Sequence, residues 1–255
     1  MRFGCCTSLE NLEAVERAGY DYIELSLRPA LMPEADESEF EPVRERIAAS
    51  PLNAEAFAGF LGAEHRVVGD HIDRERLSKY VETAARRAKE LGGEVIVFGS
   101  SGARNVPEGF LPEKAEDQIV AFLTMAGDHA ERYGITIAIE PICARESNII
   151  HTVREGWTSA KRVNHPSIRV LADLYHVWQE GEDLADLAEV GDWLVHVHIA
   201  EPVQRRYPGN DDFDFLAFFE ALRSAGYDGR ISCECRFDDF ERDARVALET
   251  LRKYV

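Results

Sequence analysis

Four residues that could hold a metal ion together each follow or interrupt a short apolar run. They are Glu140 after ITIAI, Asp173 after RVLA, His198 in LVHVHIA and Glu234 in ISCEC. Three carboxylates and one imidazole make an oxygen-rich ligand set, which suits Mn²⁺, Mg²⁺ or Co²⁺ better than Zn²⁺. The residue types therefore predict a site for one divalent metal ion, with Mn²⁺ the first choice and Zn²⁺ the least suited.

The histidine of this set is chosen by its position on a strand. His196 and His198 have the same parity, so both side chains should point to the same side of the sheet. Only His198 lies near the strand end, and it is the predicted ligand, whereas His196 is left open between an interior residue and a functional one. Glu24 in YIEL is left open between a pocket residue and an ordinary strand residue.

Eight runs rich in β-branched and apolar residues alternate with helical stretches along the whole chain. They span residues 2–6, 22–27, 52–59, 94–99, 135–140, 169–175, 193–200 and 230–237. This alternation is typical of a parallel sheet covered by helices, and roughly 250 residues is a usual length for one α/β barrel. We expect an α/β fold, a single (β/α)8 barrel domain over residues 1–255.

The four candidate ligands belong to the last four predicted strands. Catalytic side chains of such barrels project from the C-terminal ends of the strands, and adjacent strands lie about 5 Å apart. The four side chains could therefore meet one ion at that end. The polar stretches 100–112 and 201–212 follow the fourth and seventh predicted strands and are expected at the same face.

Local signals mark the helices between these strands. Thr7 with Glu10 and Ser38 with Glu41 fit the pattern of a capping box, and Pro112 suits a first helical turn. Each of these predicts a helix that starts close to the named residues.

Composition excludes several classes of partner. A net charge of −18 should repel a nucleic acid backbone, and no apolar run approaches the length of about 18 residues that a membrane span needs. The five cysteines form no CxxC pair. We therefore expect no nucleic acid partner, no membrane association and a reduced, cytoplasmic location.

The motifs resemble those of the xylose isomerase-like TIM barrels, a family of sugar phosphate isomerases and epimerases, and within it the ketose 3-epimerases of the D-tagatose 3-epimerase type. The stretches that carry the resemblance are IEPICARESN (139–148), LADLYHV (171–177), HVHIAEPVQRRYPG (196–209) and CEC (233–235). The resemblance implies that Glu140, Asp173, His198 and Glu234 are the metal ligands. It also implies a small sugar or keto-polyol substrate and a homo-oligomer, either a dimer or a tetramer.

The same resemblance implies three substrate contacts, which are Glu146, His176 and an arginine in the loop after His198. That loop is one residue longer here than in the family pattern. Arg205 is the first choice for the arginine, and Arg206 is the alternative.

The mechanism implied by the resemblance moves a proton next to a ketose carbonyl through an enediolate. Glu140 and Glu234 would act as the two proton carriers on opposite faces of the sugar, which inverts a stereocentre. If one face alone is used, the same residues would interconvert an aldose and a ketose, as in a hydroxypyruvate isomerase. The predicted enzyme is an isomerase, most simply a ketose 3-epimerase.

Other functions remain open at the level of sequence. A dehydratase acting on an inosose-like cyclic ketone would use the same metal and base, and a phosphorylated sugar could be held by an arginine such as Arg104. A non-catalytic binding subunit is the remote alternative, against which the pair Glu140 and Glu234 argues. An abasic-site endonuclease would need histidines after the third and fourth strands, and AFAGFL and VIVFGS supply none.

Overall fold

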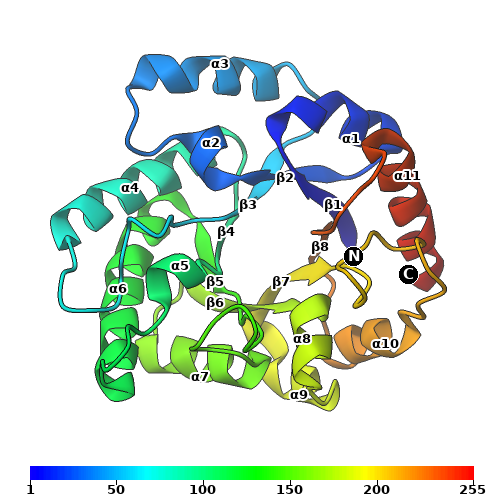
Figure 1. Ribbon diagram of the computed structural model, residues 1–255. Helices are drawn as coiled ribbons and strands as arrows, with labels where there is room; N and C mark the ends of the chain where they lie inside the picture. Colours follow the sequence, from blue (N-terminus) through cyan, green and yellow to red (C-terminus); the bar gives the residue numbers. More distant parts are fainter.

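The computed structural model describes residues 1–255 and contains a closed barrel of eight parallel strands in the order of the sequence. Figure 1 shows the strands at the centre, with β1 next to β8. The strands are β1 (Arg2–Thr7), β2 (Tyr22–Ser26), β3 (Ala54–Ala58), β4 (Val95–Phe98), β5 (Thr136–Ile139), β6 (Ile168–Asp173), β7 (Leu194–Ile199) and β8 (Arg230–Cys233). The predicted barrel and all eight predicted strands are confirmed.

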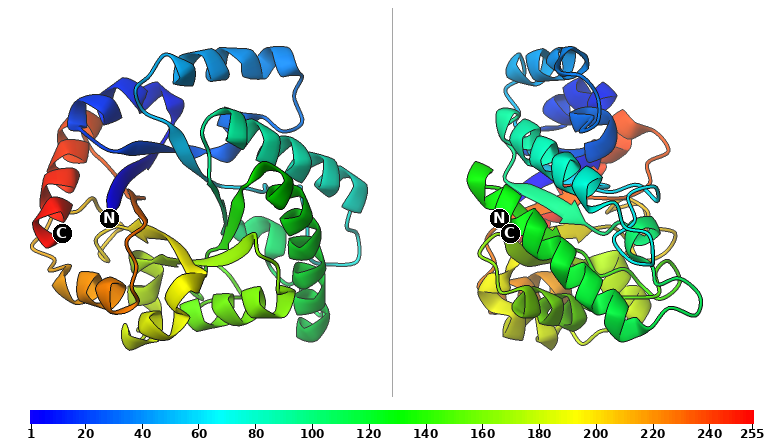
Figure 2. Two further views of the ribbon diagram at one scale, coloured as in Figure 1. Left: turned by 180° about the vertical axis from the view of Figure 1, so that it is seen from behind. Right: turned by 90° about the vertical axis from the view of Figure 1, so that its left-hand side faces the viewer.

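Helices surround the barrel in both views of Figure 2. They are α1 (Leu12–Ala18), α2 (Leu27–Leu31), α3 (Glu37–Ala48), α4 (Arg74–Glu90), α5 (Ser101–Arg104), α6 (Pro112–Tyr133), α7 (Val153–Val163), α8 (Leu174–Glu180), α9 (Ala185–Val190), α10 (Leu216–Ser224) and α11 (Phe240–Leu251). Three short 3₁₀ turns accompany them, at Leu9–Asn11, Gly191–Trp193 and Arg252–Tyr254. None of these helices is both long and apolar enough to cross a membrane.

The structure confirms one of the three predicted helix starts and corrects the other two. Pro112 is the first residue of α6, as predicted. The predicted box at Ser38 is wrong by two residues, because α3 is capped by Asp36, whose backbone N–H donates to Glu39 at 3.3 Å. The predicted box at Thr7 is also wrong, because Thr7 still belongs to β1 and a 3₁₀ turn precedes α1. Strand pairing therefore outweighs the capping preference at Thr7.

Apolar side chains fill two layers of the fold. The larger cluster has 63 buried residues and includes side chains of both the strands and the surrounding helices. A cluster of six residues fills the barrel itself: Tyr22, Ala56, Val95, Val97, Ala138 and Leu171. Tyr22 fits there because Gly4 leaves room, since a Cβ on Gly4 would lie 2.2 Å from the Tyr22 ring. These six apolar residues lie inside the barrel, below the polar residues that occupy its C-terminal half.

Candidate active site and metal centre

The four predicted ligands meet at the C-terminal end of the barrel. Each can offer one ligand atom, and these atoms all lie within 4.8 Å of one another. Asp173 ends β6 and His198 lies in β7, whereas Glu140 and Glu234 directly follow β5 and β8. The register supports this arrangement, because Asp173 pairs with His198 between β6 and β7. Neighbouring strand ends thus bring together residues that are up to 94 positions apart in the sequence.

His198 is at the centre of the cluster and uses both ring nitrogens. Its Nδ1 lies 3.1 Å from Glu140 Oε1 and 3.0 Å from Glu234 Oε2. Its Nε2 lies 2.9 Å from Glu24 Oε1, and the imidazole is fully buried. With Nε2 donating to Glu24, Nδ1 is the nitrogen that faces the other carboxylates, where it can donate a proton or coordinate an ion.

Glu24 is the residue of this site that the sequence left undecided. It is fully buried on β2, and its second oxygen lies 2.8 Å from His196 Nε2, so that one carboxylate bridges two histidines. Burial alone would raise the pKa of Glu24, but the adjacent imidazoles outweigh it and hold the pKa below its usual range. His196 is therefore an interior residue that helps to position Glu24, and the shared parity of the two histidines is confirmed.

The charges around His198 explain its protonation. Burial opposes a positive imidazole, but Glu24 and Glu234 raise the pKa of His198 well above its usual value. Burial likewise disfavours an ionised Glu234, and His198 and Arg205 overcome this and lower its pKa to about 2. Glu24 and Glu234 thus favour the charged form of the imidazole that lies between them.

Glu140 owes its position to a glycine on the neighbouring strand end. A Cβ on Gly99, which follows β4, would lie 2.1 Å from Glu140 Oε2. Any other residue at this position would force the carboxylate to move. Gly99 was not recognised as a site residue from the sequence, because its importance depends on a side chain 41 positions away.

Arg205 and Arg206 point to different places. Arg205 donates to Asp173 Oδ2 at 2.7 Å, forms an ion pair with Glu234, and lies 4.9 Å from the centre of the Tyr175 ring. Arg206 pairs with the exposed Asp238 instead. The geometry therefore favours the first choice made from the sequence, Arg205, over the alternative.

Two of the predicted substrate contacts, Glu146 and His176, form a second group beside the four candidate metal ligands. His176, Glu146 and Cys143 offer ligand atoms within 4.8 Å of one another. The backbone N–H of Cys143 donates to His176 Nδ1 at 3.3 Å, and Tyr175 donates to Glu146 at 3.4 Å. His176 Nε2 lies 3.7 Å from Asp173 Oδ2, which links this group to the first. Glu146 is exposed and His176 is buried, so the group extends from the cluster towards solvent.

Arg104, which at the level of sequence could bind the phosphate group of a phosphorylated sugar, is not available to a ligand. It is fully buried, and its guanidinium donates to the carbonyl oxygens of Phe98 and Ile150 at 2.9 and 3.4 Å. Burial lowers its pKa to about 10. Its role in this structure is to hold the chain after β4 and β5 in place.

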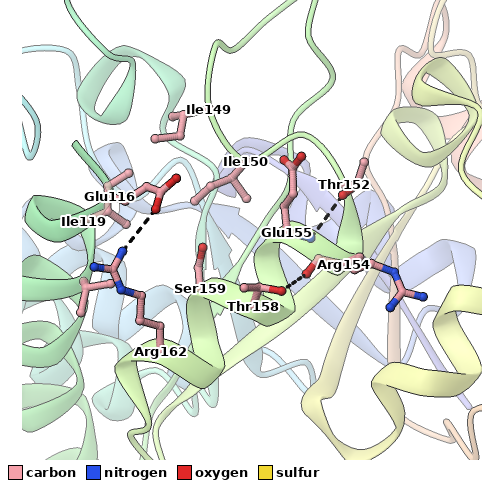
Figure 3. Close-up of a pocket in the computed structure, with 11 residues that line it drawn as sticks. Glu116, Ile119, Ile149, Ile150, Thr152, Arg154, Glu155, Thr158, Ser159 and Arg162 are labelled. Atoms are coloured by element: carbon pink, nitrogen blue, oxygen red, sulfur yellow. Dashed lines mark hydrogen bonds and ion pairs between the residues drawn. The ribbon is translucent and has the colours of Figure 1, made fainter. Parts of the chain in front are cut away.

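A separate cavity of about 460 Å³ lies between α6 and α7 on the outside of the barrel (Figure 3). Its polar side chains already pair with neighbours: Arg162 with Glu116 at 3.3 Å, and the Thr158 hydroxyl with the Arg154 carbonyl at 2.8 Å. None of the four candidate ligands lines it. This cavity is therefore separate from the candidate metal centre.

The residues at the barrel mouth fit a divalent cation. The site contains four carboxylates, those of Glu24, Glu140, Asp173 and Glu234, and one permanent cation, Arg205, which pairs with Asp173 and Glu234. The excess of negative charge is what a divalent ion would offset, and an oxygen-rich set with one imidazole is a ligand set that such ions accept.

Comparison with known proteins supports the predicted class of enzyme, a sugar epimerase or isomerase. The chain is 29% identical over 219 residues to L-ribulose 3-epimerase of Methylomonas sp., covering 86% of this chain and 74% of that protein. It is 28% identical over 196 residues to 3-dehydro-D-guloside 4-epimerase of Escherichia coli, covering 72% of this chain and 74% of that protein. The predicted class, a sugar epimerase or isomerase, is the class of these relatives.

A solved structure extends the comparison to the whole barrel. D-allulose 3-epimerase of Methylomonas sp. in complex with D-allulose superposes with a TM-score of 0.86 at 25% identity, over 100% of this chain and 97% of that one. A profile of the family described as "Xylose isomerase-like TIM barrel" matches residues 12–254. The chain belongs to the xylose isomerase-like TIM barrel family.

Proposed function

We propose that this protein is a metal-dependent epimerase that inverts carbon 3 of a free ketose. The observation that carries the proposal is the placement of Glu140 and Glu234, whose carboxylates lie 3.1 and 3.0 Å from the same atom, His198 Nδ1. Two carboxylates that share one centre can reach the same substrate carbon from two directions.

The two similar epimerases act next to a carbonyl. Carbon 3 is adjacent to the carbonyl of a 2-ketose, and carbon 4 is adjacent to the carbonyl of a 3-dehydro sugar. A proton on such a carbon is acidic enough for a carboxylate to remove when the developing negative charge is stabilised. Both reactions therefore need the same protein groups.

In the proposed mechanism, one of Glu140 and Glu234 is ionised and removes the proton from carbon 3. The other carries a proton and delivers it to the opposite face of the planar intermediate. The protonation states of the two glutamates are exchanged at the end, so protons and charge balance. The reverse reaction uses the same two residues in opposite roles.

Glu140, Asp173, His198 and Glu234 would hold the metal, for which we propose Mn²⁺. When bound, it supplies positive charge that polarises the substrate carbonyl. Arg205, Glu146 and His176 would bind hydroxyl and carbonyl oxygens of the sugar and fix which carbon faces the two glutamates. A free sugar fits this site better than a phosphate ester, because acidic residues predominate and Arg104 is buried.

The test is to incubate the Mn²⁺-loaded protein with a panel of ketopentoses and ketohexoses in deuterated water and to follow deuterium by NMR. Label at carbon 3 of an inverted product supports the proposal. Label at carbon 1 or 2 identifies an aldose–ketose isomerase, and the absence of exchange with every sugar, unchanged by a chelator, contradicts the proposal.

The assignment of the two proton carriers has its own test. In Glu234→Gln, the epimer whose carbon 3 proton faces Glu140 should still exchange that proton with solvent but should not invert. Glu140→Gln should show the same behaviour with the other epimer. Mn²⁺ binding is measured in parallel by calorimetry, and inversion at the wild-type rate in either variant would refute the assignment.

A further inference from the structure

Arg205 lies on a segment with unusual backbone geometry. Gln204 and Arg205 have φ angles of +57° and +55°, a left-handed conformation that residues other than glycine seldom adopt. Two such residues in succession persist only where surrounding contacts impose the conformation. The contacts that impose it here come from the arginine loop, which we define as residues 201–211.

Glu201, the first residue of the arginine loop, is buried beneath it. The residue is 1% exposed, and the hydrogen-bond partners of its carboxylate are backbone N–H groups. The carboxylate accepts from the backbone N–H of Gly209 at 2.8 Å and from that of Asp211 at 3.0 Å. The carboxylate thus joins the two ends of the loop.

Backbone hydrogen bonds connect Glu201 and the chain beyond β8 to the part of the loop that carries Arg205. The N–H of Glu201 donates to the carbonyl of Arg206 at 2.8 Å, and the two residues form an isolated antiparallel bridge. The carbonyl of Arg205 accepts from the N–H of Arg236, beyond β8, at 2.8 Å. Arg205 is therefore held from both sides, by the loop and by the chain that carries Glu234.

Gly209 allows the loop to close. Its φ angle is +90°, and a Cβ there would lie 2.5 Å from the Thr250 hydroxyl oxygen on α11. The loop is thus packed against α11 at the point where Glu201 binds it.

A carboxylate buried among backbone amides is costly unless those amides remain in place. Burial raises the pKa of Glu201, and the N–H groups of Asp211 and Gly209 oppose that rise. Opening of the loop would take its hydrogen bonds away from the buried carboxylate. The carboxylate therefore favours the closed loop, in which the Arg205 side chain reaches Asp173 and Glu234.

From this geometry we infer that Glu201 is a positioning residue: its buried carboxylate closes the arginine loop and thereby sets the place of the Arg205 guanidinium at the substrate site. The inference rests on the proposed function, since it assigns Arg205 to substrate binding. Glu201 itself contacts none of the four candidate metal ligands through its side chain.

A double-mutant cycle tests this inference on the ketose that shows exchange. Glu201→Ala should lower kcat/KM about 10- to 100-fold, mainly through a higher KM, because a small displacement of a positioned group has effects of this size. In an Arg205→Ala background the same change should alter kcat/KM by less than about twofold, because Glu201 would act only through Arg205. Equal effects in both backgrounds would overturn the inference.

A conservative variant and a control complete the experiment. In Glu201→Gln one oxygen can still accept from Gly209 and Asp211, so kcat/KM should lie between those of the wild type and Glu201→Ala. This variant also keeps the test open if Glu201→Ala fails to fold. Glu220→Ala, an exposed glutamate on the neighbouring α10, should match the wild type.

Hydrogen exchange separates this inference from the proposed function. The amides of Gly209 and Asp211 should exchange faster in Glu201→Ala than in the wild type, while amides of β1 to β8 remain unchanged. Unchanged exchange at these two amides would overturn the inference, whether or not any sugar is turned over. If no sugar reacts but these amides lose protection, the proposed function fails and the closure of the loop by Glu201 stands.

Discussion

Glu24 provides the most demanding test of the site. Glu24→Gln keeps the shape of the side chain but replaces one of its two acceptor oxygens with a donor group. One of the two imidazole N–H groups, at 2.8 Å for His196 and 2.9 Å for His198, then loses its acceptor in a buried place. An unsatisfied buried donor costs about 1–3 kcal/mol, so the free energy of unfolding should fall by that amount.

The loss of metal affinity should be a separate effect of similar size, measured in a different experiment. A carboxylate behind a ligand histidine fixes the ring and increases its basicity, and its removal commonly costs about 10- to 100-fold in metal affinity. That range corresponds to about 1.4–2.7 kcal/mol of binding free energy. Calorimetric titration with Mn²⁺ measures the affinity, and urea unfolding in the presence of a chelator measures the stability.

Glu55→Gln is the matched control. Glu55 is also a buried barrel glutamate, but it lies on β3 and its carboxylate binds Arg2 and Arg230 at 2.6 Å each, away from the cluster. This variant should lose stability and keep the wild-type Mn²⁺ affinity. Wild-type affinity in Glu24→Gln, or an equal loss of affinity in both variants, would refute the reasoning.

Three further predictions concern other residues. Gly99→Ala should weaken Mn²⁺ binding about tenfold or more in calorimetry, because the new Cβ would lie 2.1 Å from Glu140 Oε2. Arg205→Ala should lower kcat/KM about 100-fold in the exchange assay, and Arg206→Ala less than about fivefold, because only Arg205 reaches the cluster. Burial raises the pKa of Glu182 to about 7, so the folded protein keeps a proton there that the unfolded chain has already released. The free energy of unfolding therefore falls as pH rises from about 4.5 to about 7, and Glu182→Gln should remove roughly 1 kcal/mol of that fall in urea titrations, since solvent weakens the effect at a partly exposed group.

Each of these predictions has a result that would contradict it. Gly102→Ala adds the same methyl group in α5, where its nearest neighbour would be Ala63 at 3.1 Å, and it should leave Mn²⁺ affinity unchanged. Equal affinities in the Gly99 and Gly102 variants would show that Glu140 tolerates the methyl group. A larger effect at Arg206 than at Arg205 would reverse the arginine assignment. A fall in stability with pH that Glu182→Gln leaves intact must come from another group.

The sequence by itself determined the barrel and the place of its candidate site. Runs rich in β-branched and apolar residues alternate with helical stretches, and a parallel sheet covered by helices buries the apolar faces of both. Since the C-terminal ends of all strands share one face of the barrel, Glu140, Asp173, His198 and Glu234 could be assigned to one cluster without knowledge of the packing. The structure brings these four side chains together, with ligand atoms within 4.8 Å of one another.

Tertiary structure alone decided which neighbouring groups complete the site. Glu24 bonds to histidines 172 and 174 positions away across the barrel, and no local pattern in YIEL indicates that contact. Arg205 and Arg206 are adjacent and chemically alike, and the left-handed backbone of the loop directs one to the carboxylates and the other to Asp238. These outcomes depend on side-chain directions set by contacts between distant segments, whereas sequence periodicity reports only which face of an element is buried.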